Sequence, residues 1–272
     1  MQTSPTQLAD TALRLERLAR EAGRIAMGFW RPGARTSAEV QFKHGGSPVT
    51  AADFAVDRFL FEGVAGFLPE AGWLSEETTD DPRRLTRKTL IVVDPIDGTS
   101  AFMRGDPRWA VSIALVEDGR PAIGIVHAPA LERTFVAQSR GGAFLNGAPI
   151  AVSSRDALAG AALVVPTDMR DFLERSSHGF DFAKRTPSLA LRIAQIAMGE
   201  GDLAIAKANS RDWDIAAADV ILTEAGGVLA ELDGAPLAYN RPSSRRDMLV
   251  AAPRALIEAT LALAKAAQKG SP

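Results

Sequence analysis

The chain has 272 residues, of which 46% are hydrophobic and 24% are charged, ordinary proportions that exclude a disordered or fibrous protein. The 31 Lys and Arg residues nearly balance the 33 Asp and Glu residues, which argues against a protein dedicated to nucleic acid or to a membrane surface. The absence of cysteine excludes disulfides, zinc–thiolate sites and cysteine nucleophiles.

The N-terminus lacks the charged and apolar regions of a secretion signal, and no apolar run approaches the length of a membrane span. We therefore expect a cytoplasmic protein that binds neither membrane nor nucleic acid.

The first half of the chain shows helix and strand signals in alternation and then an antiparallel meander. Apolar residues at three- and four-residue spacing predict the helices, and short apolar runs between turn signals predict the strands. The predicted elements are a helix over 6–30, a strand over 40–43, a helix over 50–69, strands ending at 74 and 93, and strands over 111–116, 122–126 and 134–137, followed by a hairpin turn at Asn146-Gly147.

The second half returns to alternating strands and helices. No linker, composition shift or repeat divides the chain, so we expect one domain over 1–272, with an αβ half over about 1–155 and an αβα half over about 156–272. The pattern predicts a layered α/β fold in the order αβαβα. The predicted elements are strands over 161–165, 202–206, 228–231 and 248–251, and helices over 188–198, 214–225 and 254–269.

The segment Asp94-Pro95-Ile96-Asp97-Gly98-Thr99 follows the apolar run 90–93, where we expect the strand to stop at Asp94. Two carboxylates three residues apart can converge on one point. Gly98 and Thr99 then offer backbone N–H groups and a hydroxyl to an anion. An ordinary turn at a strand end would contain the same residue types.

Four other acidic positions lie at predicted element ends, beside apolar sequence. Glu76 and Glu77 follow a strand, whereas Asp53 and Asp214 begin helices, where the helix dipole alone would favour them. Carboxylates brought together repel one another unless cations are present. Oxygen ligands without cysteine indicate Mg²⁺, with Mn²⁺ as the alternative.

The ordered set of acidic motifs resembles that of the inositol monophosphatase family, within the lithium-sensitive, magnesium-dependent phosphatases. The resemblance extends from about Leu8 to Ala252. The matching motifs are Ser47-Pro48-Val49-Thr50-Ala51-Ala52-Asp53, Ser75-Glu76-Glu77, Asp94-Pro95-Ile96-Asp97-Gly98-Thr99, Gly141-Gly142-Ala143-Phe144-Leu145-Asn146-Gly147 and Trp213-Asp214-Ile215-Ala216-Ala217.

The resemblance implies the sandwich fold shared with fructose-1,6-bisphosphatase and a phosphomonoesterase that uses metal-activated water. It implies two or three Mg²⁺ ions per site and a homodimer. By the resemblance, one metal is held by Glu76, Asp94 and the Ile96 carbonyl, and a second is held by Asp94, Asp97 and Asp214. Asp53 and Thr99 transfer the proton with help from Glu76. Gly98, Thr99 and Ser100 bind the phosphate.

Two departures from the family pattern bear on function. Gly45, after Lys43-His44, stands where many members have an acidic residue near a third metal. Lys207 stands seven residues before Asp214, where inositol-specific members have a glutamate. A lysine there suits a second phosphate, although it could equally be a solvated side chain. Lys184, Arg185 and Arg211 could extend such a basic rim.

We therefore expect the substrate to be a small phosphorylated metabolite, with a 3′(2′),5′-bisphosphate nucleotide favoured. Inositol 1-phosphate, histidinol phosphate and fructose 1,6-bisphosphate remain alternatives. A non-enzymatic alternative is a partner-binding regulator of transcription antitermination, as some bacterial relatives are. The near-neutral charge counts against direct RNA contact.

Overall fold

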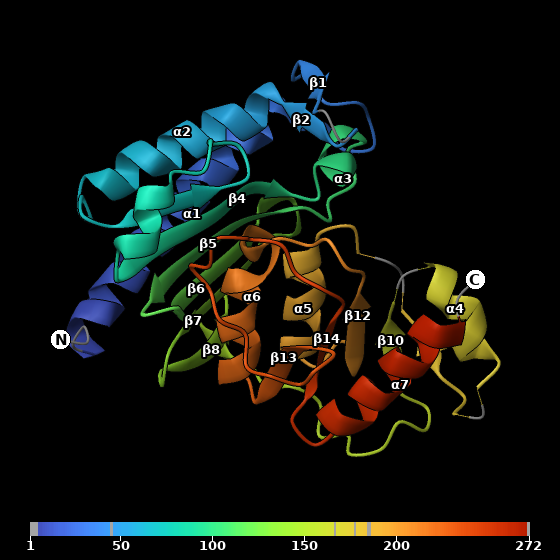
Figure 1. The fold of residues 1–272 in the computed structure, drawn as a ribbon. Coiled ribbons are helices and arrows are strands. Elements are labelled where there is room, and N and C mark those ends of the chain that lie inside the picture. The colour runs from blue at the N-terminus through green and yellow to red at the C-terminus, as the bar shows by residue number, and fades with distance from the viewer. Residues whose placement is uncertain (1–4, 44–45, 166, 177, 184–185, 271–272) are drawn as a thin grey trace.

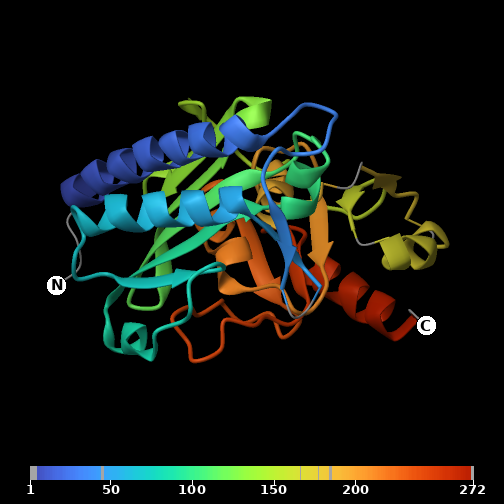
Figure 2. The ribbon, with the colours of Figure 1, turned by 90° about the horizontal axis from the view of Figure 1, so that it is seen from above.

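The computed structural model of the chain describes residues 5–43, 46–165, 167–176, 178–183 and 186–270. Two long helices form its first layer, α1 (Pro5–Phe29) and α2 (Ala51–Ala65). They lie side by side across one face of a large sheet (Figures 1 and 2). Buried side chains such as Leu15 and Leu60 pack from these helices onto Ile91 of the sheet. A hairpin of β1 (Val40–Phe42) and β2 (Pro48–Thr50) connects the two helices.

The large sheet has seven strands in the order β3-β4-β5-β6-β7-β8-β9. Only the first pair, β3 with β4, is parallel, and the rest form the predicted antiparallel meander. The strand bounds are β3 Gly72–Ser75, β4 Thr89–Asp97, β5 Ala110–Glu117, β6 Arg120–Ala128, β7 Arg133–Gln138, β8 Gly142–Leu145 and β9 Ala148–Pro149. Short helical turns lie between strands at η1 (Pro82–Thr86), α3 (Thr99–Met103) and η2 (Pro129–Leu131).

A second pair of helices, α5 (Leu189–Ala197) and α6 (Asp212–Glu224), fills the middle of the molecule. Figure 1 shows both between the large sheet and a smaller one. One face of α6 packs on β5 and β6, and the helix also contacts β13 of the smaller sheet. Because α6 is apolar on nearly every side, it is buried between both sheets, as a helix without a polar face must be.

The smaller sheet has five strands in the order β11-β10-β12-β14-β13. Helices α4 (Thr167–Glu174) and α7 (Ile257–Gly270) contact each other and lie on its outer side. The strand bounds are β10 Ala162–Val164, β11 Asp181–Phe182, β12 Leu203–Ala206, β13 Gly227–Glu231 and β14 Leu249–Pro253.

This order of layers confirms the predicted α/β sandwich. Three details of the prediction are wrong. The second helix ends at Ala65 and not at Pro69. Strand β4 continues through Pro95 to Asp97 instead of stopping at Asp94, because a bulge opposite β5 accommodates the proline, which cannot donate to the ladder. The last helix begins at Ile257 and not at Arg254, since β14 extends to Pro253. No helix among the described residues is long and apolar enough to cross a membrane.

Candidate metal and phosphate site

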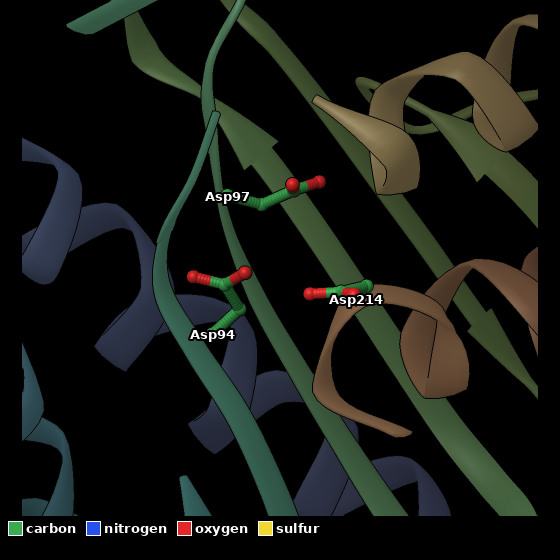
Figure 3. A group of neighbouring side chains, drawn as sticks. All are labelled: Asp94, Asp97 and Asp214. Carbon is green, nitrogen blue, oxygen red and sulfur yellow. The ribbon is translucent and has the colours of Figure 1, made fainter. Parts of the chain in front are cut away.

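Three carboxyl groups meet between β4 and α6, two of them buried and that of Asp214 half-buried. Asp94 and Asp97 come from the end of β4, and Asp214 comes from the first turn of α6. One oxygen of each lies within 4.8 Å of the others. Figure 3 shows the three carboxyl groups turned toward a common space. The convergence of these residues, predicted from their positions at element ends, is therefore found in the structure.

The bulge in β4 explains how Asp94 and Asp97 share one side of the strand. Side chains alternate along a regular strand, so residues three apart face opposite sides of the sheet. Here Asp94 pairs with Ser112 and Asp97 pairs with Ala110, so β4 contains one residue more than β5 over this stretch. The extra residue turns the Asp97 side chain to the same side of the sheet as the Asp94 side chain. The backbone N–H of Ile96 donates to Asp94 Oδ1 at 3.0 Å and fixes the turned segment.

Asp97 also caps helix α5. Its carboxylate accepts from the Ser188 hydroxyl at 2.5 Å and from the backbone N–H of Ala190 at 2.7 Å. Burial raises the pKa of Asp97 to about 6, although these hydrogen bonds favour the charged form. Gly98 allows this close approach, because its φ is +90° and a Cβ there would lie 3.1 Å from the Ser188 nitrogen.

Asp94 and Asp214 have the strongest need for a neutralising cation. Burial raises the pKa of Asp94 well above its usual range, and repulsion from Glu76, Asp97 and Asp214 raises it further. Burial and the Asp97 charge likewise raise the pKa of Asp214, against a backbone N–H of Arg211 that donates to its Oδ2 at 2.7 Å. Buried oxygen donors with no nitrogen or sulfur ligand suit a hard divalent cation.

Glu76 lies at the edge of this cluster, beyond the end of β3. Its charge reaches Asp94, as the raised pKa of Asp94 shows. The Lys43 ammonium donates to Glu76 at 2.9 Å and to Glu77 at 2.8 Å. Burial raises the pKa of Glu77 to about 7. The sequence analysis named Lys43 only as part of a motif, and its link to two acids over thirty residues away could not be seen without the fold. His44 and Gly45, on which the prediction about a third metal depends, lie outside the described residues.

Asp53 has the helix-capping role that the sequence left open, and it also lies close to Thr99. As a helix residue it accepts from the Thr50 backbone N–H at 2.8 Å and from the Thr50 hydroxyl at 2.6 Å, which closes a capping box at the start of α2. Its other oxygen, Oδ1, lies 3.5 Å from the Thr99 hydroxyl, which donates to the Ile96 carbonyl at 3.0 Å. Burial raises the pKa of Asp53 to about 6.

The sequence profile of the inositol monophosphatase family matches residues 8–269. The chain belongs to this family. Among relatives, it is 30% identical to the 3′(2′),5′-bisphosphate nucleotidase CysQ of Aggregatibacter actinomycetemcomitans over 84% of this chain and 86% of that one. It is 33% identical to the histidinol-phosphatase of Chlorobaculum parvum over 83% of this chain and 86% of that one. The structure of the IMPase of Thermotoga maritima superposes with a TM-score of 0.84 and 28% identity, over 97% of this chain and all of that one.

Membership of the inositol monophosphatase family makes the chain a hydrolase of phosphoric monoesters, and the family is metal-dependent. The relatives named as a nucleotidase and as a histidinol-phosphatase match at similar identity. Family membership therefore establishes the class of reaction and leaves the substrate to be argued from the site.

A cavity of about 380 Å³ is lined by Glu76 and by Trp213, the residue before Asp214, although Asp94, Asp97 and Asp214 are not part of its lining. Arg211 is the one basic residue of its lining. The Arg211 guanidinium donates to Ser244 Oγ at 3.4 Å and lies 5.7 Å from the centre of the Trp213 ring, so both of these partners are uncharged. Lys207 is exposed after β12 and is not part of this lining. Lys184 and Arg185 lie outside the described residues.

The sequence analysis also missed Ser188. This serine donates to Asp97 and, as the N-cap of α5, accepts from the backbone N–H of Leu191 at 3.0 Å. A serine directly before an apolar helical pattern is a typical N-cap signal, and the prediction of a helix from 188 could have used it.

Proposed function

We propose that the protein is a Mg²⁺-dependent phosphomonoesterase whose substrate carries a second anionic group beside the scissile phosphate, with a 3′(2′),5′-bisphosphate nucleotide as the first candidate. The cluster of Asp94, Asp97 and Asp214 carries the metal dependence. The cavity with Arg211 carries the choice of substrate.

By the family resemblance we expect two cation positions that share Asp94, and the cluster of Asp94, Asp97 and Asp214 supports the second of them. Glu76, Asp94 and the Ile96 carbonyl would hold one cation, and Asp94, Asp97 and Asp214 would hold the other. Divalent cations bound there would lower the pKa of water and neutralise the charge of the phosphoryl group. Gly98, Thr99 and Ser100, at the start of α3, would orient the phosphate through their backbone N–H groups.

Asp53 and Thr99 would take the proton of the attacking water. Asp53 Oδ2 is held by Thr50, whereas Oδ1 faces the Thr99 hydroxyl. A carboxyl group with a pKa of about 6 is mostly ionised at neutral pH and still accepts a proton readily. The Thr99 hydroxyl, whose closer acceptor in this structure is the Ile96 carbonyl, would turn its proton to Asp53 Oδ1 as it accepts the proton of the water.

One charge that lines the cavity, that of Arg211, supports an anionic leaving group. Its two acids are already paired, because Arg84 donates to both oxygens of Asp80 and Lys43 donates to Glu76. The Arg211 guanidinium contacts the uncharged Ser244 and Trp213, lies near enough to Asp214 to feel its charge, and can bind a phosphate through its planar fork of N–H donors. The relative named as a bisphosphate nucleotidase supports this choice. The proposal that Lys207 contributes rests on its position in the sequence.

Phosphate release tests the proposal, measured with Mg²⁺ on adenosine 3′,5′-bisphosphate, inositol 1-phosphate, histidinol phosphate and fructose 1,6-bisphosphate. Arg211→Gln and Lys207→Gln serve as a matched pair, because each removes one positive charge. We expect the nucleotide to give the highest kcat/KM and Arg211→Gln to lower that value about tenfold to a hundredfold, with inositol 1-phosphate little affected.

Three outcomes would count against parts of this proposal. A preference for inositol 1-phosphate would contradict the anionic leaving group. An effect of Lys207→Gln alone would move the second-phosphate contact from Arg211 to Lys207. Negligible release from every substrate would favour the partner-binding alternative. The homodimer and lithium sensitivity stay predictions from the family resemblance, and the cytoplasmic location stays a prediction from the sequence.

A further inference from the structure

A buried ion pair outside the carboxylate cluster holds the start of α6. The Arg246 guanidinium donates through Nε to Asp212 Oδ1 at 2.7 Å and through Nη2 to the Ala238 carbonyl at 2.7 Å. The side chains of Arg246 and Asp212 are only 1% and 0% exposed. Asp212 is the first residue of α6, two positions before Asp214.

The backbone around this ion pair joins the start of α6 to the segment that leads into β14. The N–H of Asn209 donates to the Arg246 carbonyl, and the N–H of Arg246 donates to the Ser210 carbonyl, both at 2.9 Å. The N–H of Asp212 donates to the Ser244 carbonyl at 2.9 Å. The Arg246 side chain thus locks two segments that already run together.

This joined segment also orients the Asp214 carboxylate. The backbone N–H of Arg211 donates to Asp214 Oδ2 at 2.7 Å, and Arg211 forms a β-bridge with Arg245. A shift of the segment away from residues 244–246 would move the Arg211 N–H, which is one of the groups that direct Asp214. The contacts therefore lead without a gap from the Arg246 guanidinium to Asp214.

Stability alone gives a weak reason for such a pair. Asp212 Oδ2 is buried and has no hydrogen-bond partner among the described residues. A buried ion pair with an unsatisfied oxygen recovers its desolvation cost poorly, and an apolar pair of similar size is often as stable or more so. The ion pair instead fixes the orientation of Asp212 relative to Arg246, because the planar guanidinium accepts few orientations of its partners.

The same arginine belongs to a second contact with α6, which serves as a control. The Arg246 guanidinium lies 4.6 Å from the centre of the Tyr239 ring, and the Tyr239 hydroxyl donates to Asp219 Oδ2 at 2.8 Å. Asp212 and Asp219 are seven residues apart and so lie on one face of the helix. The Tyr239 contact holds the middle of α6, about two turns away from the carboxylate cluster.

We propose that Arg246 is a positioning residue for the metal centre: through Asp212 it fixes the first turn of α6 so that Asp214 meets Asp94 and Asp97. This inference rests on the proposed function, since it gives Asp214 the role of a metal ligand. Arg246 itself touches neither the cation positions nor the cavity beside them.

Direct titration with Mn²⁺ tests this proposal without substrate, by calorimetry on the wild type, Arg246→Lys and Tyr239→Phe. Lysine keeps the positive charge but lacks the planar fork through which Arg246 donates to Asp212 and to the Ala238 carbonyl from two nitrogens. We expect Arg246→Lys to raise the Kd for Mn²⁺ about tenfold, with kcat at saturating Mg²⁺ within about twofold of the wild type. Tyr239→Phe lowers the Tm and leaves the Kd unchanged.

The proposal is overturned if Arg246→Lys lowers the Tm as Tyr239→Phe does and binds Mn²⁺ like the wild type. If Arg246→Lys does not fold, the double variant Arg246→Met/Asp212→Leu replaces it, because removing both charges leaves none buried unpaired. A Kd unchanged in that variant equally refutes the proposal. A wild type that binds no Mn²⁺ would instead refute the proposed function, so the two failures are distinguishable.

Discussion

At the scale of single residues, Asp94 carries the largest conflict between folding and function. It is 2% exposed, it is repelled by four other acids, and the hydrogen bond from Ile96 does not offset their repulsion. Such a residue destabilises the metal-free protein and stabilises the metal-bound one.

We predict opposite effects of Asp94→Asn on activity and on the stability of the metal-free protein. The variant should lose at least about a hundredfold in kcat with Mg²⁺, because a carboxylate shared by both cation positions becomes neutral. In EDTA at neutral pH its Tm should rise, since the repulsion is relieved. Phosphate release and thermal melts measure the two effects. Asp202→Asn is the control, because this carboxylate pairs with Arg155 and Ser153 away from the site. Unchanged turnover of Asp94→Asn would contradict the shared ligand.

The carboxylates of the site could be predicted because each follows or begins an element with a strong apolar pattern. Asp94 and Asp97 end a buried strand, and Asp214 begins a buried helix. Lys43 could not be predicted in the same way, and Arg211 could be named only as part of a basic rim. Their roles depend on partners such as Glu76 and on the cavity beside Trp213, which only the packing of the sheets and loops brings near.

At the scale of elements, the contact of α1 with the large sheet depends on a missing side chain. A Cβ on Gly23 would lie 2.6 Å from the ring of His127, which is buried on β6 and held by Thr134 at 2.9 Å. Glycine therefore lets α1 approach β6 closely enough to bury its apolar face.

We predict that Gly23→Ala and Gly28→Ala change stability in opposite directions. Both gain helix propensity, but overpacking against His127 outweighs the gain at Gly23, for a net loss of about 1–2 kcal/mol in the free energy of unfolding. A Cβ on Gly28 meets nothing within 4 Å, so that variant should gain about 0.5 kcal/mol. Urea unfolding measures both variants. Stabilisation of Gly23→Ala would show that the contact with the sheet is loose.

Most elements could be predicted from periodicity, and the exceptions have physical reasons. Helix α4 (Thr167–Glu174) was not predicted, since its apolar residues Met169, Phe172 and Leu173 cover only about two turns and the helix depends on α7 for its packing. The extension of β4 to Asp97 was missed because proline ordinarily ends a strand, and a bulge is visible only once β5 lies beside it.

At the scale of the whole molecule, buried acids give the metal-free protein an unusual dependence on pH. The pKa values of Asp53 and Asp97 are raised to about 6, and those of Asp94 and Asp214 are raised well above the usual range. Between about pH 4 and pH 7 the native state then holds more protons than the unfolded chain, so its stability falls as the pH rises. Burial lowers the pKa of His127 to about 4, so this residue makes stability rise with pH, but it is one group against several acids.

We predict that in EDTA the Tm is higher at about pH 5 than at about pH 8, and that saturating Mg²⁺ abolishes or reverses this order. The metal replaces the protons that otherwise relieve the repulsion, and it binds more tightly once the carboxyl groups are ionised. Thermal melts in the two conditions test this. A metal-free Tm that rises with pH would mean that the acids do not share one buried site.

Helix α6 contacts both sheets, and Asp214 in its first turn joins Asp94 and Asp97 of β4 in the carboxylate cluster. During synthesis, the ribosome releases the β4 pair long before Asp214 emerges, so an early cation would find only part of its binding partners. The complete set of metal ligands is consequently present only after α6 has packed against the sheet. Cells low in divalent ions would then accumulate chains that are folded but held together less firmly, and protease sensitivity would report that shortage.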